Sequence, residues 1–92
     1  MINIEQKTPI ELNMGIASRL KAIRRRRKIS QKVLSQKSGV SYASIRRFEQ
    51  TGEISLLSLS KIAIALEIDD ELDKLFCEIP YMSIEEVING QG

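Results

Sequence analysis

Residues 30–52, SQKVLSQKSGVSYASIRRFEQTG, contain two short helical patterns separated by one glycine. Ser30 and Ser41 are each placed to cap a helix, because a serine side chain accepts a hydrogen bond from the free amides of the first turn. Gly39 can supply the left-handed residue that a short joint between helices needs. The segment therefore predicts two helices joined by a tight turn, the second ending before Gly52.

Helix caps also predict the rest of the fold. Thr8-Pro9-Ile10-Glu11 combines an N-cap, a proline at the first helical position and a capping-box glutamate. Gly15 predicts a break in the helix that follows, Ser55 caps a fourth helix, and Asp69 caps a fifth. The apolar residues expected to face the core from these three helices are Ile16, Leu20, Ile23, Leu59, Ile62, Ala63, Leu66, Leu72, Leu75 and Phe76.

The chain has 92 residues, enough for one modest core. No segment shows the sustained alternation of a strand apart from a weak signal at Ile2 and Ile4. We therefore expect a single all-α domain of five helices over residues 1–92. Its core should span about residues 14–77, and residues 78–92 should form a C-terminal tail.

Charge is divided unevenly along the chain. Residues 1–48 carry twelve Lys and Arg and two acidic residues, a formal charge of +10. Residues 49–92 carry two Lys and ten acidic residues, a charge of −8. A charge run is usually a solvated surface, but five consecutive basic residues, Arg24 to Lys28, lie directly before the two short helices. The division predicts a polyanion-binding surface at one end of the molecule.

Composition argues against several other classes of protein. The chain has no histidine, no metal-ligand cluster and no glycine-rich phosphate loop, so we expect neither an enzyme nor a cofactor or metal. A lone Cys77 predicts a small apolar side chain rather than a reactive thiol. Aromatic residues make up 4%, too few to favour stacking on unpaired RNA bases. Because there is no long apolar run and no secretory signal, we expect a cytoplasmic protein without a membrane partner.

The spacing of residues in this region resembles a known family. Gln31-x-x-Leu34, Gly39-Val40-Ser41-x-x-x-Ile45-x-x-Phe48-Glu49-x-x-Gly52 and Leu59-x-x-Ile62-Ala63-x-x-Leu66 are similar to the Cro and phage-repressor signature, also called XRE-type helix-turn-helix regulators. The resemblance covers about residues 16–76 and implies a lambda-repressor-like fold that binds double-stranded DNA. Lys28 and Ser35 depart from it, since many members have a glycine and a small apolar residue there.

In this family the start of the second motif helix enters the major groove. The resemblance implies that the DNA bases are contacted by Tyr42, Ala43, Ser44, Arg46 and Arg47. It implies that the phosphates are contacted by Gln31, Ser41, Arg27, Lys28 and Lys32. Arg24 and Glu49 match a family pair that bridges the first and third helices, although an ordinary surface ion pair is the alternative. A residue that merely packs is the alternative for Tyr42.

Leu57, Ile64 and Ile68 form a second apolar stripe that core packing does not need, which predicts a homodimer interface. A two-fold dimer would match a palindromic operator. The stretches TPIELNMGIASRLKAIRRRRKISQ and ISLLSLSKIAIALEI and the tail LFCEIPYMSIEEVINGQG resemble HipB-type antitoxins, which pair with a HipA-like kinase toxin. A stand-alone phage-like or chromosomal repressor is the alternative. The tail retains apolar residues, so we expect it to dock on its own domain or on a partner.

Overall fold

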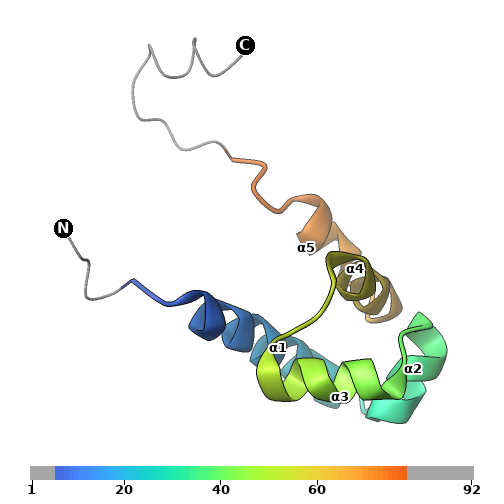
Figure 1. Cartoon of the computed structure of the whole chain (residues 1–92). Helices are drawn as coiled ribbons and strands as arrows, with labels where there is room; N and C mark the ends of the chain where they lie inside the picture. Colours follow the sequence, from blue (N-terminus) through green and yellow to red (C-terminus); the bar gives the residue numbers. More distant parts are fainter. Residues whose placement is uncertain (1–5, 79–92) are drawn as a thin grey trace, which may run out of the picture.

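The computed structural model describes residues 6–78, which form five helices and no strand. The helices are α1 (Pro9–Arg26), α2 (Gln31–Ser38), α3 (Tyr42–Thr51), α4 (Leu56–Ala65) and α5 (Asp69–Asp73). α3 packs on α1, α2 contacts both α3 and α4, and α5 follows on from α4 (Figure 1). The all-α fold of five helices predicted from the sequence is confirmed.

Four of the helices begin at the caps that the sequence predicts. At α1 the Glu11 amide donates to Thr8 Oγ1 at 3.1 Å, and the Thr8 amide donates back to Glu11 Oε1 at 3.3 Å. The residues before α2, α3 and α4 are Ser30, Ser41 and Ser55. The Oγ of each serine accepts a 3.1 Å hydrogen bond from the backbone amide three residues later in the chain. α5 is the exception, because its N-cap is Ile68, without a side-chain hydrogen bond, and Asp69 is its first residue.

Gly15 does not interrupt the first helix, so that prediction was wrong. α1 is continuous over 18 residues. A glycine inside a helix costs only about 1 kcal/mol relative to alanine. The turns of α1 that follow Gly15 bury Ala17 and Leu20 in the core, which outweighs so small a local penalty.

Aliphatic side chains from α1 to α4 fill the core around Ile45 and Leu34. The buried cluster consists of Ala17, Leu20, Leu34, Val40, Ile45, Phe48, Ile62 and Leu66. Ile16 of α1, expected to face the core, is exposed. Leu75 and Phe76, predicted to face inward, are also exposed, Phe76 by 87%. Their predicted orientation required a helix as far as residue 76, but α5 ends at Asp73 and Phe76 has a φ of 61°. Leu72 is partly buried.

The predicted tail lies mostly outside the described residues. Its apolar residues from Ile79 to Ile88 fall within residues 79–92, and the expected docking of the tail stays a prediction. Over residues 6–78, no helix has both the length and the apolar character needed to cross a membrane.

Candidate nucleic-acid interface

The joint between α2 and α3 is held by its own side chains. Gly39 has a φ of 77°, in the left-handed region that favours glycine. Ser35 Oγ donates to the Val40 carbonyl at 2.6 Å, and the Val40 amide donates to Ser38 Oγ at 3.1 Å. The Val40 side chain is buried in the core. These contacts fix the direction of α3 and explain why a polar Ser35 suits its half-buried position.

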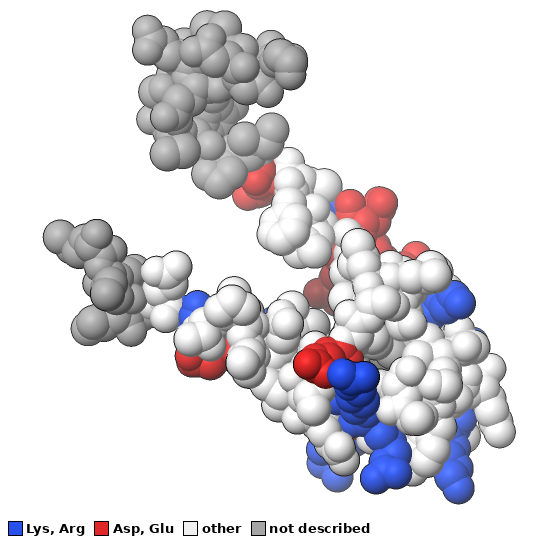
Figure 2. All heavy atoms as spheres, viewed as in Figure 1, with Lys and Arg blue, Asp and Glu red and all other residues white. Residues whose placement is uncertain are grey.

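α3 has an inner side and an outer side. Ile45 and Phe48 on the inner side are buried, and α1 is the main neighbour of the helix. All five residues predicted to contact bases are exposed: Tyr42, Ala43, Ser44, Arg46 and Arg47. Figure 2 shows Lys and Arg gathered at the end of the molecule formed by α2, α3 and the last turn of α1. The outer side of α3 therefore presents an accessible surface that carries two arginines, Arg46 and Arg47, beside neutral side chains.

Tyr42 at the start of α3 lies close to two cations. The Lys32 ammonium is 5.7 Å from the centre of its ring, and the Arg46 guanidinium carbon is 5.6 Å away. Cations within about 6 Å of an aromatic face are attracted to it. The ring is also partly exposed. Tyr42 therefore packs against its neighbours and remains accessible, so both predicted roles fit its position.

Arg24, Glu49 and Gln31 form a network that joins α1, α3 and α2. Arg24 Nε donates to Glu49 Oε2 at 2.8 Å and Nη2 donates to Oε1 at 3.0 Å. Gln31 Nε2 donates to the same Oε1 at 2.9 Å, and Arg24 Nη1 donates to the Ile29 carbonyl at 2.8 Å. The Arg24 and Glu49 side chains are 10% and 5% exposed. The pair is thus a buried bridge between helices, and not a surface ion pair.

The network also changes the acidity of Glu49. Burial is the largest single influence and raises the pKa of this carboxyl. Hydrogen bonds from Arg24 and Gln31, with the charges of Arg24 and Lys21, together outweigh burial and hold the pKa below its ordinary value of 4.5. Glu49 therefore stays ionised at neutral pH and keeps both of its partners.

A model of the helix-turn-helix family matches residues 20–72, more than half of the 92-residue chain. The chain belongs to the helix-turn-helix family. It is an XRE-type, DNA-binding transcription regulator with a lambda-repressor-like all-α fold. No curated protein gives a significant match to it.

The helix-turn-helix regulator holds its predicted phosphate-contacting residues around the same end. Lys28, Lys32 and Ser41 are exposed, and Gln31 is partly buried against Glu49. Arg27 Nη1 lies 3.1 Å from Glu67 Oε2, a pair on the surface that the sequence spacing did not predict. Lys28 has a φ of 57°, which explains why glycine suits this position in other members.

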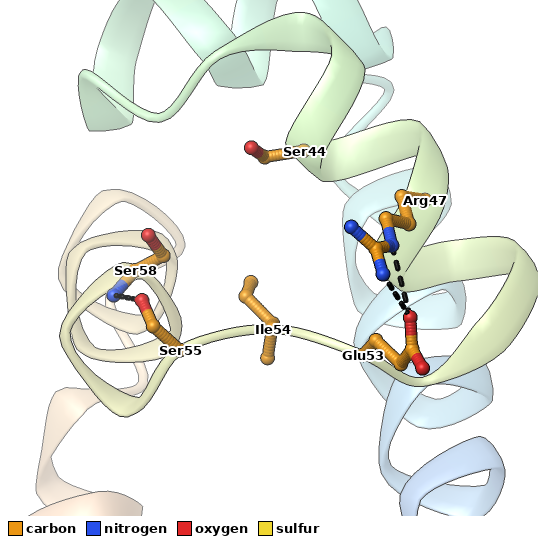
Figure 3. Close-up of a pocket in the computed structure, with 6 residues that line it drawn as sticks. All are labelled: Ser44, Arg47, Glu53, Ile54, Ser55 and Ser58. Carbon is orange, nitrogen blue, oxygen red and sulfur yellow. Dashed lines mark hydrogen bonds and ion pairs between the residues drawn. The ribbon is translucent and has the colours of Figure 1, made fainter.

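A second surface ion pair lies at the outer side of α3. Arg47 donates from Nε and Nη2 to a single oxygen, Glu53 Oε2, at 2.9 and 2.5 Å. The pair borders a shallow pocket between α3 and the start of α4, which Ser44, Ile54, Ser55 and Ser58 also line (Figure 3). Sequence analysis did not identify Glu53, because six residues separate it from Arg47 and the loop geometry alone brings them together.

The predicted dimer residues do not share one exposed stripe. Leu57 and Ile64 on α4 of the helix-turn-helix regulator are 67% and 63% exposed. Ile68, predicted to join them, is partly buried and packs against the core. Ile68 follows the end of α4. The chain turns at Glu67, which has a φ of 60°, and this turn directs the Ile68 side chain away from the exposed side of α4. Leu56, at the start of α4, is also exposed and adds to this apolar surface.

Proposed function

We propose that the protein binds specific duplex DNA by inserting α3 into the major groove. Tyr42, Ala43, Ser44, Arg46 and Arg47 would contact base edges. Phosphates would be contacted by Gln31, Ser41, Arg27, Lys28 and Lys32. The observation that carries this proposal is the exposed cationic outer side of α3, held in a fixed direction by the glycine joint.

Salt dependence tests the phosphate contacts. Each neutralised phosphate should contribute about −0.9 to the slope of log affinity against log salt. Lys28→Gln should lower the magnitude of that slope by about 1 and weaken binding to all sequences alike. Lys74→Gln, which removes an exposed lysine just beyond α5, is the matched control and should leave the slope unchanged. A binding constant that is insensitive to salt would refute the proposed interface.

We also propose a homodimer that binds a palindromic operator, with Leu57 and Ile64 at the subunit contact. Both are large apolar side chains exposed on α4. Ile64→Lys should produce monomers in sedimentation and abolish tight operator binding without loss of helical content. Leu12→Lys places the same charge at a comparably exposed site on α1 and should leave the dimer intact. Half-sites should lie about 34 Å apart, one turn of DNA. A parent protein that sediments as a monomer at high micromolar concentration would contradict the dimer.

The finer proposal is that this regulator is the antitoxin and autorepressor of a HipBA-type toxin–antitoxin pair. Support comes from the separation of surfaces. The acidic residues of α5 lie away from the cationic end (Figure 2). The exposed Leu75 and Phe76 follow α5 in the chain, so this part of the molecule would be available to a partner while DNA is bound.

The antitoxin proposal is tested by co-expression with a kinase-like protein encoded next to this gene. A complex should form and should bind the operator as a whole. Truncation after Cys77 should preserve DNA binding and weaken the complex, because the apolar tail is expected to contact the toxin. Operator binding and repression without any such neighbouring gene or complex would favour the stand-alone repressor instead.

A further inference from the structure

Glu53 is the acidic residue beside the outer side of α3. Two guanidinium nitrogens of Arg47, Nε and Nη2, donate to its Oε2 (Figure 3). Both side chains are well exposed, 69% for Arg47 and 61% for Glu53. Exposed ion pairs contribute little to stability, so folding does not account for a carboxylate at this position.

A carboxylate here is unfavourable for non-specific attraction to DNA. Phosphates attract Lys and Arg, and a negative charge beside them weakens that attraction. Among the exposed basic residues of α3, Arg47 alone has an ion-pair partner within residues 6–78, whereas Arg46 lies against the Tyr42 ring. Glu53 therefore acts on one particular side chain, the arginine expected to contact a base.

The geometry of the pair leaves the outer edge of Arg47 free to bind. Arginine has five N–H donors in a planar fork. Glu53 takes the side edge, formed by Nε and Nη2, while the remaining nitrogen points away from Glu53 toward the open pocket (Figure 3). The end edge, with one N–H from each terminal nitrogen, is the pair of parallel donors that guanine O6 and N7 accept. The carboxylate thus fixes the plane of the fork without occupying its base-binding edge.

Glu53 is itself held in place relative to α3. Its amide donates to Thr51 Oγ1 at 3.2 Å, and Thr51 Oγ1 donates to the Arg47 carbonyl at 2.7 Å. The preceding Gly52 is buried close to the backbone of α1 at Asn13. The loop that carries the carboxylate is therefore anchored to the same helix turn that carries Arg47.

We propose that Glu53 is a positioning residue that determines specificity by orienting the Arg47 fork toward one guanine of the operator. This inference rests on the proposed function, because it requires that α3 contacts base edges. Holding the fork before binding reduces the side-chain freedom that is lost when the complex forms. The negative charge at the same time weakens contacts with phosphates that carry no sequence information. Glu53 would therefore lower the affinity for non-specific DNA and increase the preference for the operator over other sequences.

The experiment uses the full chain and a pool of randomised duplexes, from which the wild-type protein first selects its preferred sequence. Single base-pair changes in that sequence then give a preference at each position. The position at which Arg47→Ala loses preference is the Arg47 contact. There, Glu53→Ala should lower the preference by about tenfold, within the range expected for a bidentate guanine contact. It should also increase affinity for unrelated duplexes, and Glu53→Gln should have a smaller effect on preference.

Two controls separate the orientation of the Arg47 guanidinium from the general effect of a negative charge near the DNA. Glu67→Ala removes the carboxylate of the other exposed pair, with Arg27, and should raise affinity for all duplexes without altering any base preference. In an Arg47→Ala background, Glu53→Ala should change no preference further, because Glu53 acts through Arg47. Thermal unfolding of each variant checks that the fold is retained.

The outcomes distinguish the two levels of proposal. If the wild-type protein selects no sequence, the proposed function fails and the role of Glu53 fails with it. If a sequence is selected but Glu53→Ala keeps the preference at the Arg47 position, or lowers all positions equally, only the positioning role is wrong. The same holds if Arg47→Ala leaves every preference unchanged.

Discussion

On its inner side α3 carries a buried ion pair between Glu49 and Arg24, and on its outer side an exposed one between Arg47 and Glu53. The buried pair sits among protein atoms and has Gln31 as a third partner. The exposed pair borders solvent and a shallow pocket. Loss of either partner of the inner pair leaves a charge without compensation, whereas water can replace either partner of the outer pair. One short helix thus separates residues that hold the fold from residues available to DNA.

The glycines that end α2 and α3 differ in a similar way. Gly39 and Gly52 have almost equal φ angles of 77° and 78°. A Cβ added at Gly39 would have no atom within 4 Å, whereas one added at Gly52 would lie 2.9 Å from the Asn13 carbonyl carbon in α1. Glycine is therefore favoured at position 39 only because of the backbone angle. At position 52 it is also favoured because α1 approaches the end of α3 closely.

The largest expected effect comes from removing one member of the buried pair. Arg24→Ala should lower the free energy of unfolding by about 3–5 kcal/mol, because the buried Glu49 is left without an opposite charge. Arg27→Ala, which removes the exposed pair with Glu67, should cost at most about 1 kcal/mol. Urea titration of both variants measures the difference. Equal losses would show that burial does not separate the two pairs.

The next largest effect is expected at the glycines. Gly39→Ala should cost about 1–2 kcal/mol for the left-handed backbone alone. Gly52→Ala should cost about 1–3 kcal/mol more, because α1 has to shift to admit the Cβ. The same urea titration compares them. Similar costs would mean that the contact between Gly52 and α1 is not tight in solution.

The pH dependence of stability isolates the carboxylate of Glu49. Its pKa is lowered in the folded protein, so its contribution is fully present above the unfolded pKa, near 4.5, and is lost as pH falls through the folded value. Glu49→Gln should cost about 1.5–3 kcal/mol at pH 7. As the pH falls below 4.5, the free energy of unfolding of the parent protein should decrease and approach that of the Glu49→Gln variant. If the difference in unfolding free energy between the parent protein and the variant stayed constant from pH 7 to pH 3, ionisation of Glu49 would not be coupled to stability.

The smallest effect on stability is expected on the outer side. Arg47→Ala should change the free energy of unfolding by less than about 1 kcal/mol, since its pair is exposed. The same substitution should lower discrimination at one base pair by about 1–3 kcal/mol. Unfolding and binding are measured on the same preparation. A large loss of stability would place Arg47 among the residues that hold the fold.

Most helix boundaries could be predicted from the sequence because caps are local. Ser30, Ser41 and Ser55 each accept a bond from an amide three residues away, so the sequence contains both partners. Gly39 likewise acts through its own backbone angle. The failures occurred where a longer-range effect dominates: the continuous helix through Gly15, and the exposure of Phe76 beyond the end of α5.

The sequence by itself determined the five-helix pattern, the glycine joint and the cationic first half, since these depend on near neighbours and on composition. Tertiary structure alone decided the two surface ion pairs. Glu53 meets Arg47, and Glu67 meets Arg27 forty residues away, only because loops return these carboxylates to the basic end. It also partly buried Ile68 against the core and left Ile64 exposed. Which side chains meet across a loop depends on how the helices pack. The number of residues between two side chains does not reveal their distance in space.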